Sequence, residues 1–250
     1  MIIYFTCYLN VLFMFLEIND LHKKFGAENV LSDLNLQLGE RQMLSILGRS
    51  GCGKTTLLKI IAGLEQSDGG IIKIAGKVMN EVSAHQRNIV YMYQEPLLFP
   101  HLNVFDNVAF GLRLRKMLRA TIEARVSEML DALELSEQAR KMPHQLSGGQ
   151  RQRVAFGRAL IINPQVLLLD EPFGALDTET RQAMQVLLIR IMQTHPITAI
   201  FVTHDLKEAI IMGDRIGIME KGKLAIFPDK KTFIAQNEYV KKEINFWQNL

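Results

Sequence analysis

One stretch of this chain constrains its fold more than any other, and it reads Gly48, Arg49, Ser50, Gly51, Cys52, Gly53, Lys54, Thr55 and Thr56. It follows the apolar run 43–47 and precedes a segment of helical apolar periodicity that continues to Leu64. Glycines allow the backbone angles that turn successive N–H groups inward, and a helix beginning near Lys54 adds the positive end of its dipole. The pattern therefore predicts a strand, a phosphate-binding loop and a helix. A glycine-rich turn that binds nothing is the alternative.

The residues of this loop also indicate which cofactors it would take. The Lys54 ammonium should reach the β- and γ-phosphates of a nucleotide as a point charge. The Thr55 hydroxyl should bind Mg²⁺, a hard ion that retains waters and needs few protein oxygens. We therefore expect ATP and Mg²⁺.

Two adjacent carboxylates, Asp170 and Glu171, close the apolar run 166–169. The continuous apolar character of this run suits a strand that is buried on both faces. Paired carboxylates at its end are costly unless a cation reaches them, and Mg²⁺ bound to ATP is such a cation. The structural alternative is an N-cap at Asp170 with Glu171 in the first turn of a helix.

Another apolar run, 197–202, ends in Thr203 and His204. Three predicted strands thus deliver Gly48, Asp170 and His204 at their carboxyl ends. In open parallel α/β sheets this edge is where ligands bind. The convergence predicts one site at that edge.

A second turn with glycines consists of Ser147, Gly148, Gly149 and Gln150. It places a serine hydroxyl and backbone N–H groups at the start of a helix that we expect to continue until Pro164. An ordinary helix N-cap is the alternative interpretation.

The phosphate loop, the stretch 146–150 and the run 166–172, in this order, resemble the motifs of the ATP-binding subunit of an ABC transporter. The resemblance covers about residues 15–228. It implies a homodimer that closes around ATP and reopens after hydrolysis, with residues 147–150 of one copy at the γ-phosphate held by the other. The stretch 174–177, which ends in Asp177, resembles the family's loop that crosses the same interface.

The resemblance also implies catalytic roles for Glu171, His204 and Gln94. Glu171 would orient and deprotonate the attacking water, His204 would contact the γ-phosphate, and Gln94 would touch both Mg²⁺ and the water. Asp170 would hold Mg²⁺ through water, beside Thr55. Without the resemblance, a histidine or a glutamine at the end of a strand is more often an ordinary hydrogen-bonded group.

Phe25 stands where the family carries an aromatic ring that stacks on adenine, and an ordinary core phenylalanine is the alternative. The sequence departs from the family at three places. Arg49 stands where Pro or Asn is more usual, Tyr93 stands where Phe is common, and the stretch 227–236 lacks the usual glycine-rich turn. None of these departures removes a catalytic group.

The expected fold is α/β, a P-loop NTPase of the ABC ATPase type, with a mostly parallel core sheet, an antiparallel β edge subdomain and an inserted helical subdomain. With 250 residues, of which 48% are hydrophobic and 22% charged, the chain can bury one sizeable core and a smaller subdomain. We place the ATPase domain at 14–228, its helical subdomain at about 96–163 and a C-terminal helical tail at 229–250.

Periodicity locates further elements of this fold. Alternating strands are expected at 16–21 and 71–78, a helix at 178–193, and a hairpin around 220–223. Within the helical subdomain one buried face is predicted to contain Leu112, Leu114, Met117, Leu118, Ile122, Val126, Met129 and Leu130.

The two ends of the chain are less regular. The apolar opening of 16 residues is shorter than the roughly 20 that span a bilayer, and it lacks the basic start and cleavage site of a signal peptide. Met14 is an alternative start, so 1–13 is an extension of the reading frame, a membrane-touching segment or an extra edge strand. Only 22 residues follow Pro228, which is too few for the additional β-domain of many importer ATPases.

The charge and the cysteine content limit the kinds of partner and the cellular compartment that we expect. The net charge is +3, and the densest basic run, Arg113, Arg115, Lys116 and Arg119, is typical of a solvated helix face, so we expect no nucleic acid partner. The two cysteines have neither metal-ligand spacing nor the arrangement of a disulfide framework, which fits a reducing cytoplasm.

The stretch 97–112 resembles that of importers of polyamines, ferric iron, inorganic oxyanions and sulfonates. The resemblance therefore implies solute import, with integral-membrane permease subunits and a solute-binding protein as partners and a peripheral place on the cytoplasmic face of the membrane. An exporter ATPase and a non-transport ABC ATPase are the alternatives. A non-transport member would show a long coiled coil, a second cassette or an altered Gln94 region. The transported substrate is chosen by the other chains.

Overall fold

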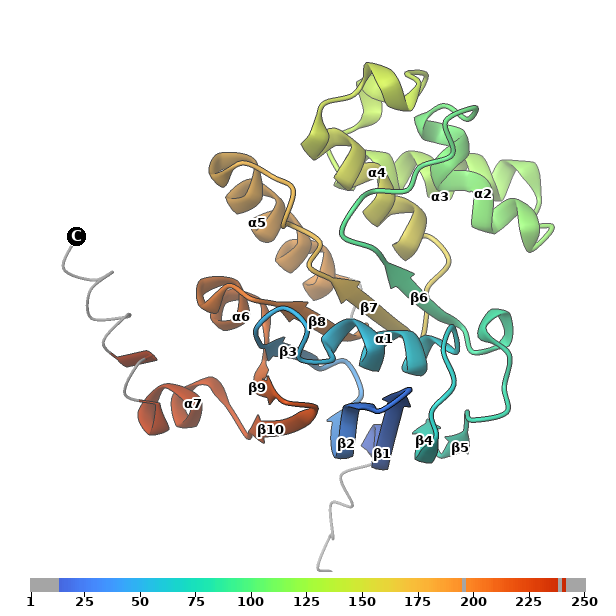
Figure 1. The fold of residues 1–250 in the computed structure, drawn as a ribbon. Coiled ribbons are helices and arrows are strands. Elements are labelled where there is room, and N and C mark those ends of the chain that lie inside the picture. The colour runs from blue at the N-terminus through green and yellow to red at the C-terminus, as the bar shows by residue number, and fades with distance from the viewer. Residues whose placement is uncertain (1–13, 195–196, 238–239, 242–250) are drawn as a thin grey trace, which may run out of the picture.

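The core of the protein is a six-stranded sheet, seen in the computed structural model, which describes residues 14–194, 197–237 and 240–241 (Figure 1). In spatial order its strands are β10 (Lys223–Phe227), β9 (Arg215–Glu220), β3 (Met43–Leu47), β8 (Thr198–Thr203), β7 (Val166–Asp170) and β6 (Ile89–Met92). All neighbours are parallel except β9 and β10, which form an antiparallel hairpin. The predicted mostly parallel core and the hairpin near 220–223 are confirmed.

A separate four-stranded antiparallel sheet forms the predicted β edge subdomain. Its strands, in spatial order, are β2 (Glu28–Gly39), β1 (Met14–Phe25), β4 (Gly69–Ile74) and β5 (Lys77–Val78). The single strand predicted at 71–78 is wrong, because Ala75 and Gly76 have φ of 48° and 77° and turn the chain between β4 and β5. Strand β2 was not predicted at all, although Leu34, Leu36 and Leu38 alternate along it and are buried.

The helical part of the chain between β6 and β7 contains α2 (Val104–Leu114), α3 (Arg119–Ala132) and α4 (Gly148–Leu160), with short 3-10 turns at Ser136–Gln138 and Pro143–Gln145. The single buried face predicted from Leu112 to Leu130 is wrong at Leu114 and Leu118, which are 69% and 78% exposed. The reason is a break in the helix. Lys116 has a φ of 54°, so α2 and α3 are two helices whose periodicities are out of phase.

The remaining helices are α1 (Lys54–Ala62), α5 (Thr178–Thr194), α6 (Leu206–Met212) and α7 (Lys230–Gln236), and a 3-10 turn spans Ala84–Gln86. Helix α1 packs against β6, β7 and β8, and α6 packs against β3 and β8. The predicted start of the helix at Thr178 is confirmed.

Strand β7 shows why the sheet is buried on both faces. Val166 and Leu168 join one hydrophobic cluster with α1 and the antiparallel sheet, while Leu167 and Leu169 join a second cluster with the helices α2 to α5. All four side chains have 0% exposure. The continuous apolar run is therefore a strand that separates two cores.

The predicted extension 1–13 lies outside the described residues, as do 238–239 and 242–250 of the predicted tail 229–250, whose described part contains helix α7. Within the described parts of the chain, no helix combines the length and the apolar character that crossing a bilayer requires.

Candidate active site

Three parallel strands end side by side at one edge of the core sheet. Leu47 of β3 is in register with Thr203 of β8, and Asp170 of β7 is in register with Val202 of β8. The backbone N–H of Gly48 donates to the Thr203 carbonyl at 3.2 Å, which extends this pairing into the loop after β3. Parallel strands therefore bring Gly48, Asp170 and the residues after Thr203 to one place, as predicted.

The loop 48–53 has glycines at positions where a side chain would be strained or would clash. Gly51 and Gly53 have φ of 81° and 108°. A Cβ on Gly53 would lie 2.8 Å from the Val30 carbonyl oxygen, and one on Gly48 would lie 2.6 Å from the Met219 carbonyl oxygen. Gly53 precedes α1 without a side-chain cap, so the first N–H groups of this helix remain available for an anion.

The Lys54 side chain folds back over this loop. Its Nζ donates to the carbonyl oxygens of Gly48 at 2.8 Å and Arg49 at 3.1 Å, and it lies 3.7 Å from Glu171 Oε1. The residue is only 5% exposed. The Lys54 ammonium is thereby held in the loop by neutral carbonyl acceptors. A phosphate is a stronger acceptor and could replace them as its partner.

Both oxygens of the Asp170 carboxylate accept a hydrogen bond. The Thr55 hydroxyl donates to Oδ1 at 3.1 Å and the Tyr91 hydroxyl donates to Oδ2 at 2.5 Å. Burial, followed by the bond to Asp170, raises the pKa of Tyr91 well above its usual range, so that Tyr91 is a constant donor. Sequence reasoning missed Tyr91. The available signal was a hydroxyl-bearing aromatic residue within the otherwise apolar run 89–92.

Glu171 and His204 form a hydrogen-bonded pair. The Glu171 Oε2 atom lies 2.8 Å from His204 Nδ1. Glu171 has a φ of 46°, which is unfavourable for a residue with a side chain, and its N–H donates to the Val202 carbonyl at 3.1 Å. The turn after β7 thus directs Glu171 towards Lys54 on one side and His204 on the other.

A cavity of about 430 Å³ collects most of the predicted site residues. Its lining consists of Phe25, Val30, Ser50, Gly51, Gly53, Lys54, Thr55, Thr56, Gln94, Asp170 and Glu171. Phe25 is 48% exposed, so the interpretation as a core residue is wrong, and the Lys23 Nζ lies 4.9 Å from the centre of its ring. The Phe25 ring and Gln94, which lie near the ends of strands in different sheets, border the same cavity as the phosphate loop.

Three residues of the loop face another direction. Gly48, Arg49 and Cys52 line a neighbouring cavity of about 860 Å³, together with His204 and Met219. The half-buried Cys52 side chain also packs against the hydrophobic cluster shared by α1 and the antiparallel sheet. The spacing alone did not distinguish these residues from those that line the first cavity.

The residues Ser147, Gly148, Gly149 and Gln150 do not line the cavity around Lys54 in the described part of the chain. They form the start of α4 as a capping box, in which Ser147 Oγ accepts from the Gln150 N–H at 3.2 Å and Gln150 Oε1 accepts from the Ser147 N–H at 3.0 Å. Asp177 accepts from the Thr180 N–H at 3.0 Å, and this bond lowers the pKa of its carboxyl. Both turns are well-formed helix starts, and the N-cap geometry is present in each.

Comparison with known proteins places these features in one family. The family profile described as ABC transporter matches residues 31–174. The chain is 46% identical over 209 residues to the "Spermidine/putrescine import ATP-binding protein PotA" of Photobacterium profundum, with 84% of this chain and 56% of the relative aligned.

A second relative is the "Sulfate/thiosulfate import ATP-binding protein CysA" of Pectobacterium atrosepticum, at 45% identity over 213 residues, with 84% of this chain and 64% of the relative aligned. The chain therefore spans between about half and two thirds of the length of these relatives. Because the family profile covers more than half of the chain, including the phosphate loop and Glu171, the chain belongs to the ABC transporter family and has the fold of an ABC ATPase domain.

Proposed function

We propose that this chain is the ATP-hydrolysing subunit of an ABC importer. The observation that carries the proposal is the meeting of Lys54, Thr55, Asp170, Glu171 and His204 at one edge of the core sheet. The names of its relatives, which describe import of polyamines and of sulfate, support the direction of transport. The transported solute would be set by the permease and by a solute-binding protein.

The residues present fit a magnesium ion. The Thr55 hydroxyl at the start of α1 lies 3.1 Å from the Asp170 carboxylate at the end of β7, and Gln94 borders the same cavity. These are oxygen donors, which Mg²⁺ prefers, and they are few, which suits an ion that keeps several waters. Thr55, Asp170 and Gln94 would hold the ion, which when bound neutralises charge on the phosphates.

The remaining residues of the cavity would hold the nucleotide. The N–H groups at the start of α1 and the Lys54 ammonium would bind the phosphates, since the uncapped helix start and Lys54 both offer donors to an anion. The exposed ring of Phe25 offers a face on which adenine can stack.

Glu171 is the base that this geometry supports. Its carboxylate borders the cavity, and the His204 ring, 2.8 Å away, fixes its orientation. A carboxylate in this position can orient a water and accept its proton as the water attacks the γ-phosphate. The hydrogen bond to Glu171 would also keep the His204 ring close to the γ-phosphate.

The site needs a second copy of the chain to be complete. Ser147, Gly148, Gly149 and Gln150 stand at the start of a 13-residue helix, yet lie away from the cavity around Lys54. In a head-to-tail homodimer, each copy would present this helix start to the phosphate held by the other, and the Asp177 loop would cross between them. The dimer would bind its permease subunits at the cytoplasmic face of the membrane.

Two substitutions test the catalytic part of the proposal. Glu171→Gln should keep the affinity for Mg²⁺ and ATP while turnover falls by about 10²–10⁴-fold, because only the base is removed. Lys54→Ala should instead weaken ATP binding. Phosphate release and equilibrium titration with a fluorescent ATP analogue measure the two effects.

The exposed Glu179 in the first turn of α5 gives a matched control, and Glu179→Gln should hydrolyse ATP like the wild type. Turnover of Glu171→Gln close to that of the wild type would rule out Glu171 as the base. The transport part is tested by reconstituting the chain with its permease in vesicles. ATP-driven uptake that disappears with Glu171→Gln is expected, and outward movement of the solute would refute import.

A further inference from the structure

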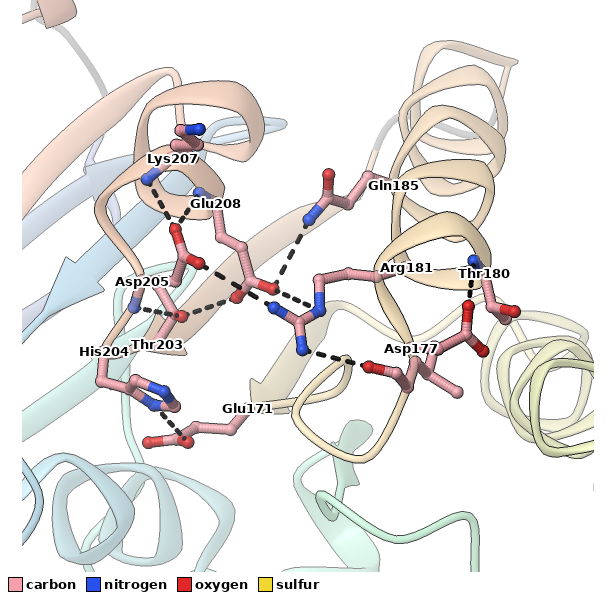
Figure 2. Close-up of polar contacts among 11 residues, drawn as sticks. Glu171, Asp177, Thr180, Arg181, Gln185, Thr203, His204, Asp205, Lys207 and Glu208 are labelled. Atoms are coloured by element: carbon pink, nitrogen blue, oxygen red, sulfur yellow. Dashed lines mark hydrogen bonds and ion pairs between the residues drawn. The ribbon is translucent and has the colours of Figure 1, made fainter. Parts of the chain in front are cut away.

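A second cluster of charged side chains lies next to the proposed active site, between α5 and α6 (Figure 2). At its centre is Glu208, which is only 5% exposed. The Thr203 hydroxyl donates to Glu208 Oε2 at 2.6 Å, the Gln185 amide donates to Oε1 at 3.5 Å, and the Arg181 Nε lies 3.8 Å from Oε1. Burying a carboxylate is costly, and burial raises the pKa of Glu208. A carboxylate kept in a buried position next to the site points to a role other than packing.

One arm of the cluster leads to His204. Thr203, the preceding residue, donates to Glu208 through its hydroxyl and accepts from the Asp205 N–H at 3.0 Å with the same oxygen. Thr203, on one side of His204, is therefore bonded to Glu208, and the Asp205 backbone, on the other side, is linked to Glu208 through the Thr203 hydroxyl. His204 in turn holds Glu171 (Figure 2).

The other arm leads to the loop that contains Asp177. The Arg181 guanidinium donates to the Leu176 carbonyl at 3.0 Å, and the Arg181 backbone N–H donates to the Asp177 carbonyl at 2.9 Å. Asp177 caps the same first turn of α5 through the Thr180 N–H. The Arg181 side chain is therefore bonded directly to the loop that contains Asp177.

The junction between the two arms is loosely made. Arg181 Nε is 3.8 Å from Glu208, the Arg181 Nη1 atom is 3.9 Å from Asp205, and Nε has no hydrogen-bond partner among the described residues. Both distances exceed those of hydrogen bonds, so a shift of about 1 Å would close the guanidinium on either carboxylate. The position of α5 therefore sets how closely the guanidinium approaches the two carboxylates.

We propose that Arg181 and Glu208 are positioning residues that transmit the position of the Asp177 loop to His204. In a dimer, contact of the Asp177 loop with the second copy would change the position of His204 in the same chain. Through His204 it would also change the position of Glu171. The inference rests on the proposed function where it assigns His204 and Glu171 to hydrolysis. It goes further in giving two residues outside the cavity a part in controlling them.

The test uses Glu208→Gln and Arg181→Gln in the full chain. Each should lower kcat about tenfold and leave the KM for ATP within about twofold, because the geometry at His204 changes while the nucleotide cavity does not. The double variant should lose no more than the more damaging single variant, since both break one connection. Arg181→Lys, which keeps the charge, should lose less than Arg181→Gln.

A spectroscopic readout separates positioning from a merely structural role. The chain has six histidines, and His204→Ala identifies the His204 ring resonance by its disappearance. At fixed pH this resonance should shift in Glu208→Gln and in Arg181→Gln. It should not shift in Glu123→Gln, which breaks an exposed ion pair with Arg119 of 2.8 Å on α3 and should also leave kcat unchanged.

The outcomes distinguish the two proposals. An unmoved His204 resonance, or losses of kcat that multiply in the double variant, would refute the coupling while leaving the ATPase intact. Wild-type turnover in His204→Ala would refute both the coupling and the catalytic role of His204. If Glu208→Gln does not fold, Arg181→Gln and Arg181→Lys at the half-buried end of the connection decide the question alone.

Discussion

Tyr91 contributes a hydrogen bond to a carboxylate that is 9% exposed, and Thr55 supplies the only other donor that the described structure gives Asp170. Tyr91→Phe leaves Asp170 Oδ2 without its partner. We expect the free energy of unfolding to fall by about 1–3 kcal/mol, the cost of an unsatisfied buried polar group. Bound Mg²⁺ and ATP should reduce this deficit, because the cation then compensates the carboxylate.

Urea unfolding with and without Mg²⁺ and ATP measures this effect. Tyr93→Phe is the matched control, since Tyr93 is 43% exposed and its ring packs next to that of Tyr91. Its free energy of unfolding should stay within about 0.5 kcal/mol of the wild type. Equal stability of Tyr91→Phe and the wild type would mean that the hydroxyl contributes nothing to holding Asp170.

Glu208 should affect stability in a pH-dependent way. Because burial raises the pKa of Glu208 in the folded chain above its ordinary value of 4.5, the folded state holds this proton more tightly than the unfolded state does. Stability is therefore lost as the pH rises from 4.5 through the folded-state pKa. Glu208→Gln has no charge to bury and should be more stable than the wild type at about pH 8.

The difference between Glu208→Gln and the wild type should shrink as the pH falls towards 4.5, and chemical unfolding at several pH values follows it. Glu123→Gln, which changes an exposed carboxylate, should show a smaller pH-dependent difference. A Glu208→Gln variant that is less stable than the wild type in mildly alkaline buffer would show that the Thr203 and Arg181 contacts outweigh the burial of the charge.

At the level of elements, the start of α4 combines two functions that a single substitution can separate. Ser147 caps the helix through Gln150, and we propose that it also faces the phosphate of a second copy. Ser147→Asp keeps a good capping oxygen but adds a negative charge. We expect stability within about 0.5 kcal/mol of the wild type and loss of ATP hydrolysis, because the charge would repel the phosphate.

Ser147→Ala is the reciprocal variant. Loss of the cap should cost about 1 kcal/mol of stability, while the absence of an added charge should leave more activity than Ser147→Asp retains. Thermal unfolding and phosphate release measure the pair. Full ATP hydrolysis by Ser147→Asp would reduce Ser147 to an ordinary helix cap.

At the level of the whole molecule, the proposed site is shared between two copies, and mixed dimers can show this. One copy with Ser147→Arg paired with one copy with Glu171→Gln places both defects in one composite site and leaves the other site intact. Both defects on one chain, paired with a wild-type chain, damage both sites. We expect partial ATP hydrolysis from the first dimer and less from the second.

Turnover per chain of the wild type should also rise with protein concentration until dimers saturate. Equal activity of the two mixed dimers, together with a specific activity that does not change on dilution, would contradict a shared site.

Local signals in the amino-acid sequence were enough to predict the central elements of the fold. The runs before Gly48, Asp170 and His204 are apolar enough to be central strands. The spacing of Gly48, Gly53 and Lys54 is specific to phosphate-binding loops. These signals predicted the parallel core, the helix starts at Lys54 and Thr178, and the meeting of the three strand ends.

Contacts between side chains that are far apart in the chain became visible only once the elements were packed together. Tyr91 reaches Asp170 over 79 residues and Gln185 reaches Glu208 over 23, and no periodicity or motif spacing encodes such contacts. The apolar periodicity did not predict the break between helices at Lys116, and the motif spacing did not predict which cavity Cys52 lines. The physical reason is that backbone propensity and apolar period act over a few residues, whereas these contacts depend on how packed elements place their side chains.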